Sequence, residues 1–560
     1  MKRPFLTLLT FFLFCFGAFS LKTAASSGAE NQNIPIGVSP AVPLSESSYR
    51  DLDKLIGLGL IDRFVIGQKP YSRNEFARMI GEAIEHYSRV TDPLEKKNSS
   101  LEETHRALMR KVEIDHALNR LKKEFEQELI NRGSLPGKTA SIDLRGLHAM
   151  RFNFTGTNSP FRKVLPRNGL GSIDATVNPL LAYQEGRHFA RGAQTSFQTE
   201  HWISLSPYAN LYAVPRFQLQ YSSQDHPEEN GAFAQKLSAR FGAKNVELLV
   251  GRETVAWGPG AHGGLLLSDN ARPLDMLRVS NPSPSSLPGP LKSLGLLKYS
   301  LLVANMGPSF SFEDAYLAGW RLDWKPHRHL ELGFSQLVYL GGEGSRGPSA
   351  GEAVLNTLGI SNGSISRNRL LSADAVLTVP SWGGLQLYAE MLFDGSELSG
   401  RQTGVYAGLY LPRLNSSGTA DLRVEFKRLG GAVYRDNTYL SGHALNELML
   451  GDSLGPGAFG AYAFFNIDVS KNFTLKTDWA FERRSFALYG FPVGVPSPSD
   501  EDRIRVGLGS EFRRGSLTFK PRFSYERAQN FKGVGGNARN LFLADLSIEL
   551  KLDWYFKKSF

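Results

Sequence analysis

Cysteine is almost absent from this chain. Cys15 is the single cysteine among 560 residues, and it lies in an apolar run from Phe5 to Phe19 that follows Lys2 and Arg3. Basic residues, a short apolar run and then small residues are typical of a secretory signal peptide, which we predict for residues 1–25. The run is short for a membrane-spanning helix. The exported part is therefore expected to lack disulfides, a thiol nucleophile and cysteine-based metal sites.

The usual motifs of enzymes are also missing. The sequence contains no nucleophile elbow, no phosphate-cradling glycine loop and no histidine pair at helical metal-binding spacing. His327 and His329 alternate beside a predicted tight turn, where solvated histidines are more common than metal ligands. Glu501 and Asp502 are neighbours in a predicted loop and do not define a glycosidase pair. We therefore predict no catalytic residue, no bound metal, no cofactor and no enzymatic activity.

Neither long hydrophobic segments nor blocks of like charge occur beyond the N-terminal run. The mean hydropathy of −0.24 excludes a polytopic helical membrane protein. The formal net charge of +10 is spread along the chain in alternating signs, which disfavours nucleic acid as a partner. An acidic polysaccharide or the phosphates of lipopolysaccharide are the better candidates for electrostatic attraction.

Helical periodicity is present only within residues 40–135. Apolar residues at helical spacing predict a short helix over residues 49–56 that stops at Gly57, and a capping box over Ser72 to Glu75 predicts the start of a second helix. A third, longer helix with one apolar stripe is predicted between Asp92 and Gly133. We predict that residues 40–135 form a periplasmic helical module.

Two pieces of this module, Gly59 to Ile61 and Ser72 to Ala77, resemble half of an S-layer-homology unit. The resemblance implies contact with cell-wall polymers. The acidic-glycine loop of that unit is missing, and the alternative is a small periplasmic packing module.

From about Ala140 the apolar period changes to two and stays there to the end of the chain. Between Asp421 and Lys427, for example, three apolar residues alternate with four charged ones. Such runs are about ten residues long, whereas strands of soluble sandwiches have about five or six. Glycine (56) and phenylalanine (36) are plentiful, as expected of many strands joined by turns. We predict a mainly β fold, a transmembrane antiparallel β-barrel of roughly 16–18 strands over residues 140–560, preceded by the helical module.

The predicted connections are unequal in length. Stretches rich in glycine and serine at residues 341–366, 430–456 and 490–502 are long, whereas Lys325 to His327 and Arg514 to Gly515 are predicted to be tight turns. Outer-membrane barrels have long loops outside the cell and short turns in the periplasm.

The end of the chain points to the same class of protein. An amphipathic last strand that ends at Phe560 resembles the signal read by the barrel-assembly machinery. That machinery, outer-membrane lipid and lipopolysaccharide are therefore expected partners, and a continuous apolar outer face favours a monomer.

The residues from Gly251 to Ser280 combine turn chemistry, a tryptophan, a histidine and arginines between strand-like runs. The pieces Gly251-Arg252, Trp257 to Gly260 and Asn270 to Pro273 are similar to pieces that recur in the Wzi family of capsule-assembly proteins. That resemblance implies an outer-membrane β-barrel that acts as a lectin for surface polysaccharide.

Recognition of a polysaccharide needs flat aromatic faces and donors for hydroxyl and carboxylate groups, and arginine can bind both oxygens of a uronic acid. The candidate polysaccharide-binding residues are therefore Arg252, Trp257, His262, Asn270 and Arg272. The alternative is that the segment around Trp257 only holds a turn.

Residues of the predicted long loops could equally form an external binding face; they are Arg346, Tyr434, Arg435 and Tyr439. The predicted function is non-covalent binding of exported capsular or extracellular polysaccharide, which is anchored or assembled at the cell surface through many weak contacts. The alternatives are a porin-like channel lined by the inward charges and a structural tether to the cell wall through the helical module.

Overall fold

Most of the chain forms one closed barrel. The computed structural model describes residues 37–560 except 92–100, 161, 165–170, 178–184, 188–190, 206–207, 223–229, 262, 288, 346–348, 358–367, 396–401, 486–497 and 559–560, so the predicted signal peptide and Phe560 lie outside it. The long strands of the barrel are β2 (Ile142–Thr157), β5 (Gly192–Leu205), β6 (Ala209–Ser222), β7 (Gly231–Ala243), β8 (Val246–Glu253), β10 (Leu274–Ser280), β12 (Leu296–Asn305), β13 (Tyr316–His327), β14 (Leu330–Leu340), β15 (Arg369–Val379), β16 (Leu385–Asp394), β17 (Thr403–Leu411), β18 (Ala420–Leu429), β21 (Ala458–Ser470), β22 (Phe473–Arg484), β23 (Glu501–Arg514), β24 (Leu517–Gln529) and β25 (Arg539–Lys558). These eighteen strands pair antiparallel in chain order, and β2 pairs with both β5 and β25, which closes the barrel. The predicted fold class and strand number are confirmed.

The alternation along each strand separates two faces of the wall. In β18 the side chain of Phe426 is 50% exposed on the outside, whereas its neighbours Glu425 and Lys427 are buried in the lumen. The apolar residues therefore form the outer surface, and the charges are enclosed.

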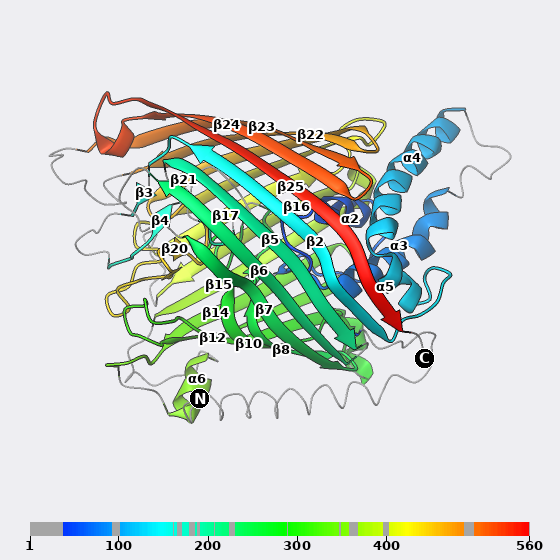
Figure 1. Ribbon diagram of the computed structural model, residues 1–560, viewed down its shortest axis with the longest axis horizontal. Coiled ribbons are helices and arrows are strands. Elements are labelled where there is room, and N and C mark those ends of the chain that lie inside the picture. Colours follow the sequence, from blue (N-terminus) through cyan, green and yellow to red (C-terminus); the bar gives the residue numbers. More distant parts are fainter. Residues whose placement is uncertain are drawn as a thin grey trace.

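The two ends of the barrel differ, as predicted (Figure 1). Short turns join β7 to β8, β13 to β14, β21 to β22 and β23 to β24 at the end where β2 begins and β25 ends. We call this the short-turn end, and the other the long-loop end.

Two predictions at the ends of strands are wrong. The residues Lys325 to His327 are not a turn, because β13 continues to His327 and Pro326 is accommodated where the register with β14 shifts. Glu501 and Asp502 are not in a loop, because they begin β23, where the Glu501 carboxylate pairs with Arg503 at 2.5 Å.

Within the described residues, four helices precede the wall: α2 (Ser48–Gly57), α3 (Arg73–Thr91), α4 (Leu101–Glu124) and α5 (Glu126–Asn131). The first two agree with the predicted helices. The third was predicted as one helix, but Phe125 has non-helical φ and ψ and separates α4 from α5, with its ring stacked 4.8 Å from that of Phe76. The predicted start at Asp92 lies outside the described residues. Among the described helices, none is both long enough and apolar enough to span a bilayer.

Residues 37–72, which include α2, enter the lumen, and we call this segment the plug. The backbone N–H groups of Ile66 and Gly67 donate to the Glu331 carboxylate of β14 at 2.9 and 3.0 Å. Arg50 of α2 pairs with Asp421 at 2.5 Å and Asp468 at 2.7 Å. The remaining helices α3, α4 and α5 lie at the short-turn end (Figure 1).

Two long connections also fold inward. Residues 254–273, the inner loop, join β8 to β10, and their short strand β9 (Ala256–Trp257) pairs with β1 (Gln68–Lys69) of the plug. Residues 430–457, the second loop, join β18 to β21 and pack on the inner loop through hydrogen bonds such as that from Ser268 N to Leu450 O at 2.7 Å. The smaller elements are β3 (Arg162–Lys163), β4 (Thr176–Val177), β11 (Ser285–Ser286), β19 (Ala444–Leu445), β20 (Leu448–Met449), α6 (Ala350–Thr357) and the 3-10 turns η2 (Gly289–Leu294), η3 (Pro380–Trp382) and η4 (Phe531–Gly533).

Candidate functional site

Trp257 belongs to the buried core that the plug, the inner loop and the wall form together. It pairs with Gln68 of the plug and forms a bridge to Leu267, and its side chain is 1% exposed. Gly258 follows with φ of 118°, and its N–H donates to Gly67 O at 3.0 Å. Only glycine adopts this conformation readily, so the Trp-Gly-Pro-Gly sequence holds a turn that joins the inner loop to the plug.

Arg252 lies on the other side of the wall from Trp257. Its neighbour in β8, Glu253, points into the lumen and pairs with Arg240, while Arg252 points outward and pairs with Asp275 of β10 at 2.6 Å. The Arg252 and Asp275 side chains are 38% and 54% exposed, so this is a surface ion pair.

The other candidates from this segment are also separated. Asn270 is buried, and its Nδ2 donates to Met449 O of the second loop at 3.0 Å. The Arg272 guanidinium lies 5.4 Å from the centre of the Phe233 ring of β7. His262 lies outside the described residues. Arg252, Trp257, Asn270 and Arg272 therefore do not share one surface.

The loop residues given as an alternative external binding face are buried instead. Tyr434, Arg435 and Tyr439 of the second loop are at most 4% exposed. The Tyr434 hydroxyl donates to Leu265 O of the inner loop at 2.5 Å, so these side chains hold the two loops together. That prediction is wrong because the second loop turns into the barrel. Arg346 lies outside the described residues.

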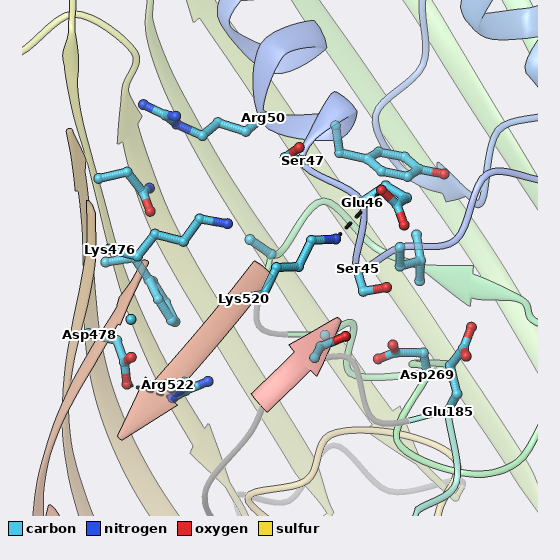
Figure 2. A pocket seen from close by; sticks show the side chains of 18 of the residues that line it. Ser45, Glu46, Ser47, Arg50, Glu185, Asp269, Lys476, Asp478, Lys520 and Arg522 are labelled. Carbon is cyan, nitrogen blue, oxygen red and sulfur yellow. Dashed lines mark hydrogen bonds and ion pairs between the residues drawn. The ribbon is translucent and has the colours of Figure 1, made fainter. Parts of the chain in front are cut away.

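A cavity of about 400 Å³, with many charged residues in its lining, lies between the plug, the inner loop and the barrel wall. Figure 2 shows Lys476 and Asp478 of β22 and Lys520 and Arg522 of β24 on its wall side, with Glu46 of the plug facing them. Nine basic and seven acidic side chains line it. They are Arg50, Lys69, Arg151, Arg187, Arg216, Arg423, Lys476, Lys520, Arg522, Glu46, Asp53, Glu185, Asp269, Asp421, Asp478 and Asp545.

The lining combines paired charges with aromatic rings. Arg522 pairs with Asp478 at 2.9 Å, and among the described residues Lys69 forms no ion pair within 4.0 Å. Tyr49 and Tyr410 also contribute to the lining. Charged donors and acceptors beside aromatic faces are what the hydroxyl groups and apolar faces of sugars require.

Sequence reasoning missed this cavity as a site. The alternation from Asp421 to Lys427 predicts Asp421 and Arg423 on the charged face of their strand, but most strands of the wall carry such charges. The cavity residues differ from the others only in facing a space that the plug leaves open.

Among the described residues, one group could hold a metal ion, and it lies at the short-turn end, where the Asp62 carboxylate is 3.9 Å from Arg328 of the turn between β13 and β14. Ligand atoms of Asp62, Glu82 and His86 lie within 4.8 Å of one another. The Glu82 carboxylate already accepts the N–H groups of Asp62 and Arg63 at 2.7 and 3.1 Å. Packing of the loop after α2 against α3 accounts for this group without a metal.

Comparison with known proteins identifies the family. The family model described as "Capsule assembly protein Wzi" matches residues 171–541, which is more than half of the chain. The chain belongs to the Wzi family. It is therefore an outer-membrane β-barrel, in agreement with the closed wall and its apolar outer face.

Two relatives illustrate the relationship. The Wzi structure of Escherichia coli, described as a carbohydrate-binding β-barrel involved in group 1 capsule assembly, has 15% sequence identity, a TM-score of 0.63, and coverage of 92% of this chain and 99% of its own. The "uncharacterized 55.8 kDa protein in cps region" of Klebsiella pneumoniae is 25% identical over 277 residues, which is 49% of this chain and 46% of that protein. The chain thus matches about half the length of this curated relative, and the structural likeness concerns the fold.

Asp269, which lines the cavity of this Wzi-family protein, has a pKa near neutral pH. The side chain is 6% exposed, and burial, followed by the nearby Glu185 carboxylate, raises the pKa of Asp269 to about 7, whereas Lys236 and Arg187 lower it. Figure 2 shows Asp269 and Glu185 together on the side of the cavity away from Lys476.

The raised pKa makes stability depend on pH at this position. The folded protein binds the Asp269 proton more tightly than the unfolded chain, so this contribution to stability falls as pH rises from about 4 to about 7. The side chain in Asp269→Asn does not titrate. The free energy of unfolding of this variant minus that of wild type is therefore expected to be roughly 2–3 kcal/mol larger at pH 8 than at pH 5. Urea unfolding in detergent micelles at both pH values measures it. The same difference in unfolding free energy at both pH values would contradict the raised pKa of Asp269.

Proposed function

We propose that this protein binds exported capsular polysaccharide non-covalently and helps to anchor or assemble it at the cell surface. Membership of the Wzi capsule-assembly family carries the proposal. The description of the Escherichia coli relative as a carbohydrate-binding barrel supports it. Because that relative is described by what it binds, we propose no enzymatic activity for this chain.

We propose that the cavity between plug and wall contributes to binding, since it places charged donors and aromatic rings around a space of about 400 Å³. Within the predicted segment, Trp257 and Asn270 would act indirectly by holding the inner loop. Arg272 and His262 remain proposed direct contacts. Arg252 would act at the membrane-facing surface, where it pairs with Asp275.

The lengths of the connections support an orientation in the membrane. Outer-membrane barrels have their short turns in the periplasm, so we propose that α3, α4 and α5 of the predicted module of residues 40–135 lie on the periplasmic side, with the plug in the lumen and the long loops outside. The continuous apolar outer face supports a monomer in contact with outer-membrane lipid and lipopolysaccharide, inserted by the barrel-assembly machinery.

The test is capsule retention in a deletion strain, measured as cell-bound against shed polysaccharide. Complementation by wild type should restore retention, and complementation by Arg522→Ala should restore it only in part, because Arg522 lines the cavity. Arg483→Ala is the matched control, since Arg483 forms an ion pair with Asp502 and its side chain is 54% exposed. Unchanged retention in the deletion strain would overturn the proposed function.

A further inference from the structure

A second polar cavity, of about 280 Å³, lies in the lumen at the short-turn end. Its lining includes Lys471 and Asn472 from the turn between β21 and β22, and Gly515 and Ser516 from the turn between β23 and β24. Arg120 of α4 lies on its other side. The cavity therefore reaches the turns at this end of the barrel.

The two cavities meet inside the barrel. Glu46 and Ser47 of the plug and Lys520 of β24 line both of them. Figure 2 shows the Lys520 side chain extended toward Glu46 across the space between wall and plug.

An ion cluster lies where the two cavities share lining residues. The Glu46 carboxylate pairs with Arg151 of β2 at 2.6 Å, with Lys520 at 3.7 Å and with Lys551 of β25 at 3.9 Å. Glu549 of β25 lies within 3.2–3.8 Å of the same three cations. Four of the five groups belong to the wall, so Glu46 is the contribution of the plug to this cluster, which we call the Glu46 cluster.

We propose that the two cavities form one polar passage along β2 and β21–β25, through which water and small ions cross the plugged barrel, with the Glu46 cluster as its narrowest point. Seven basic and six acidic side chains line the second cavity, and nine basic and seven acidic side chains line the first. The excess of positive charge in both favours small anions. This activity goes beyond polysaccharide binding and does not depend on it.

The experiment is conductance of the full-length protein in planar lipid bilayers with a KCl gradient. Wild type should show a small conductance, and its reversal potential should indicate selectivity for chloride over potassium. Glu46→Ala removes the plug's part of the cluster and leaves three wall cations opposite Glu549, so conductance should rise severalfold and remain selective for chloride.

Glu75→Ala is the matched control. Glu75 of α3 also pairs with a lysine of the wall, Lys298 at 2.6 Å, but it lines neither cavity. Its conductance should equal that of wild type. An equal rise in both variants would overturn the passage, because it would indicate general loosening of the plug.

A second variant keeps the proposal testable if Glu46→Ala fails to fold. Cys15 is the only native cysteine, so Lys520→Cys in a Cys15→Ser background provides a single thiol at the meeting point of the cavities. An anionic methanethiosulfonate reagent should reduce the chloride current of this variant and leave the Cys15→Ser parent unchanged. Absence of current in all variants, or complete modification without a change in current, would overturn the proposal.

Discussion

Trp257→Ala should destabilise the protein by about 3–5 kcal/mol, as expected when a large buried aromatic side chain is removed. Trp257 is 1% exposed and belongs to the core that the plug, inner loop and wall form together. The cavity left behind cannot close easily, because β9 is held on one side by β1 and on the other by Leu267. Urea unfolding in detergent micelles measures the loss, and heat-dependent mobility on gels reports whether the barrel itself still forms.

Arg252→Ala is the control from the same segment. Arg252 forms an exposed ion pair with Asp275, and such pairs contribute about 0–1 kcal/mol. If the two variants lost similar stability, the assignment of Trp257 to the core and Arg252 to the outer surface would be wrong. Polysaccharide retention should follow the same order, since Trp257 holds the inner loop against the plug.

Arg321→Ala should be similarly damaging, by about 3–5 kcal/mol, because it leaves buried carboxylates without their cation. Arg321 of β13 pairs with Asp323 at 2.5 Å and with Asp374 of β15 at 2.7 Å, and all three side chains are 0% exposed. Asp323 also accepts a hydrogen bond from Gln68 of the plug at 2.5 Å, so this group connects the plug to the wall.

The rescue variant separates charge from packing. Adding Asp374→Asn to Arg321→Ala removes one of the two orphaned charges and should recover part of the lost stability, although Asp374→Asn alone breaks the same pair. Unfolding of the single and double variants in urea gives the interaction free energy between Arg321 and Asp374. If the double variant were less stable than Arg321→Ala, unpaired charge would not be the cause of the damage. Limited proteolysis should cut within residues 37–72 more readily in Arg321→Ala.

Much of the wall could be predicted because its outer face contacts lipid and its inner face contacts a polar lumen. The alternation from Asp421 to Lys427 predicts which side chains face lipid, and Phe426 and Glu425 lie as expected. The errors lie at strand ends, where Lys325 to His327 has the composition of a turn. Pro326 is tolerated there by a local shift of register, which depends on the neighbouring strand.

The candidate site was predicted only in part. In the segment from Gly251 to Ser280, the sequence predicts a sharp turn, because Trp-Gly-Pro-Gly contains proline and two glycines. Its composition does not show that the turn faces inward and binds the plug, so Trp257 resembled a sugar-stacking residue until its burial was known. The second loop presented the same difficulty, because the tyrosines at 434 and 439 suit an exposed loop and a buried one equally well.

The sequence by itself determined the barrel, its approximate strand number, the faces of its strands and the helices that precede it, because these follow from local periodicity and turn chemistry. Only the tertiary structure decided what fills the lumen. Contacts such as Arg50 with Asp421, which are 371 residues apart, and Glu46 with Lys520 depend on shape and charge complementarity between distant segments. Local patterns carry no record of such pairing, so only the tertiary structure shows the cavity between the plug and the wall.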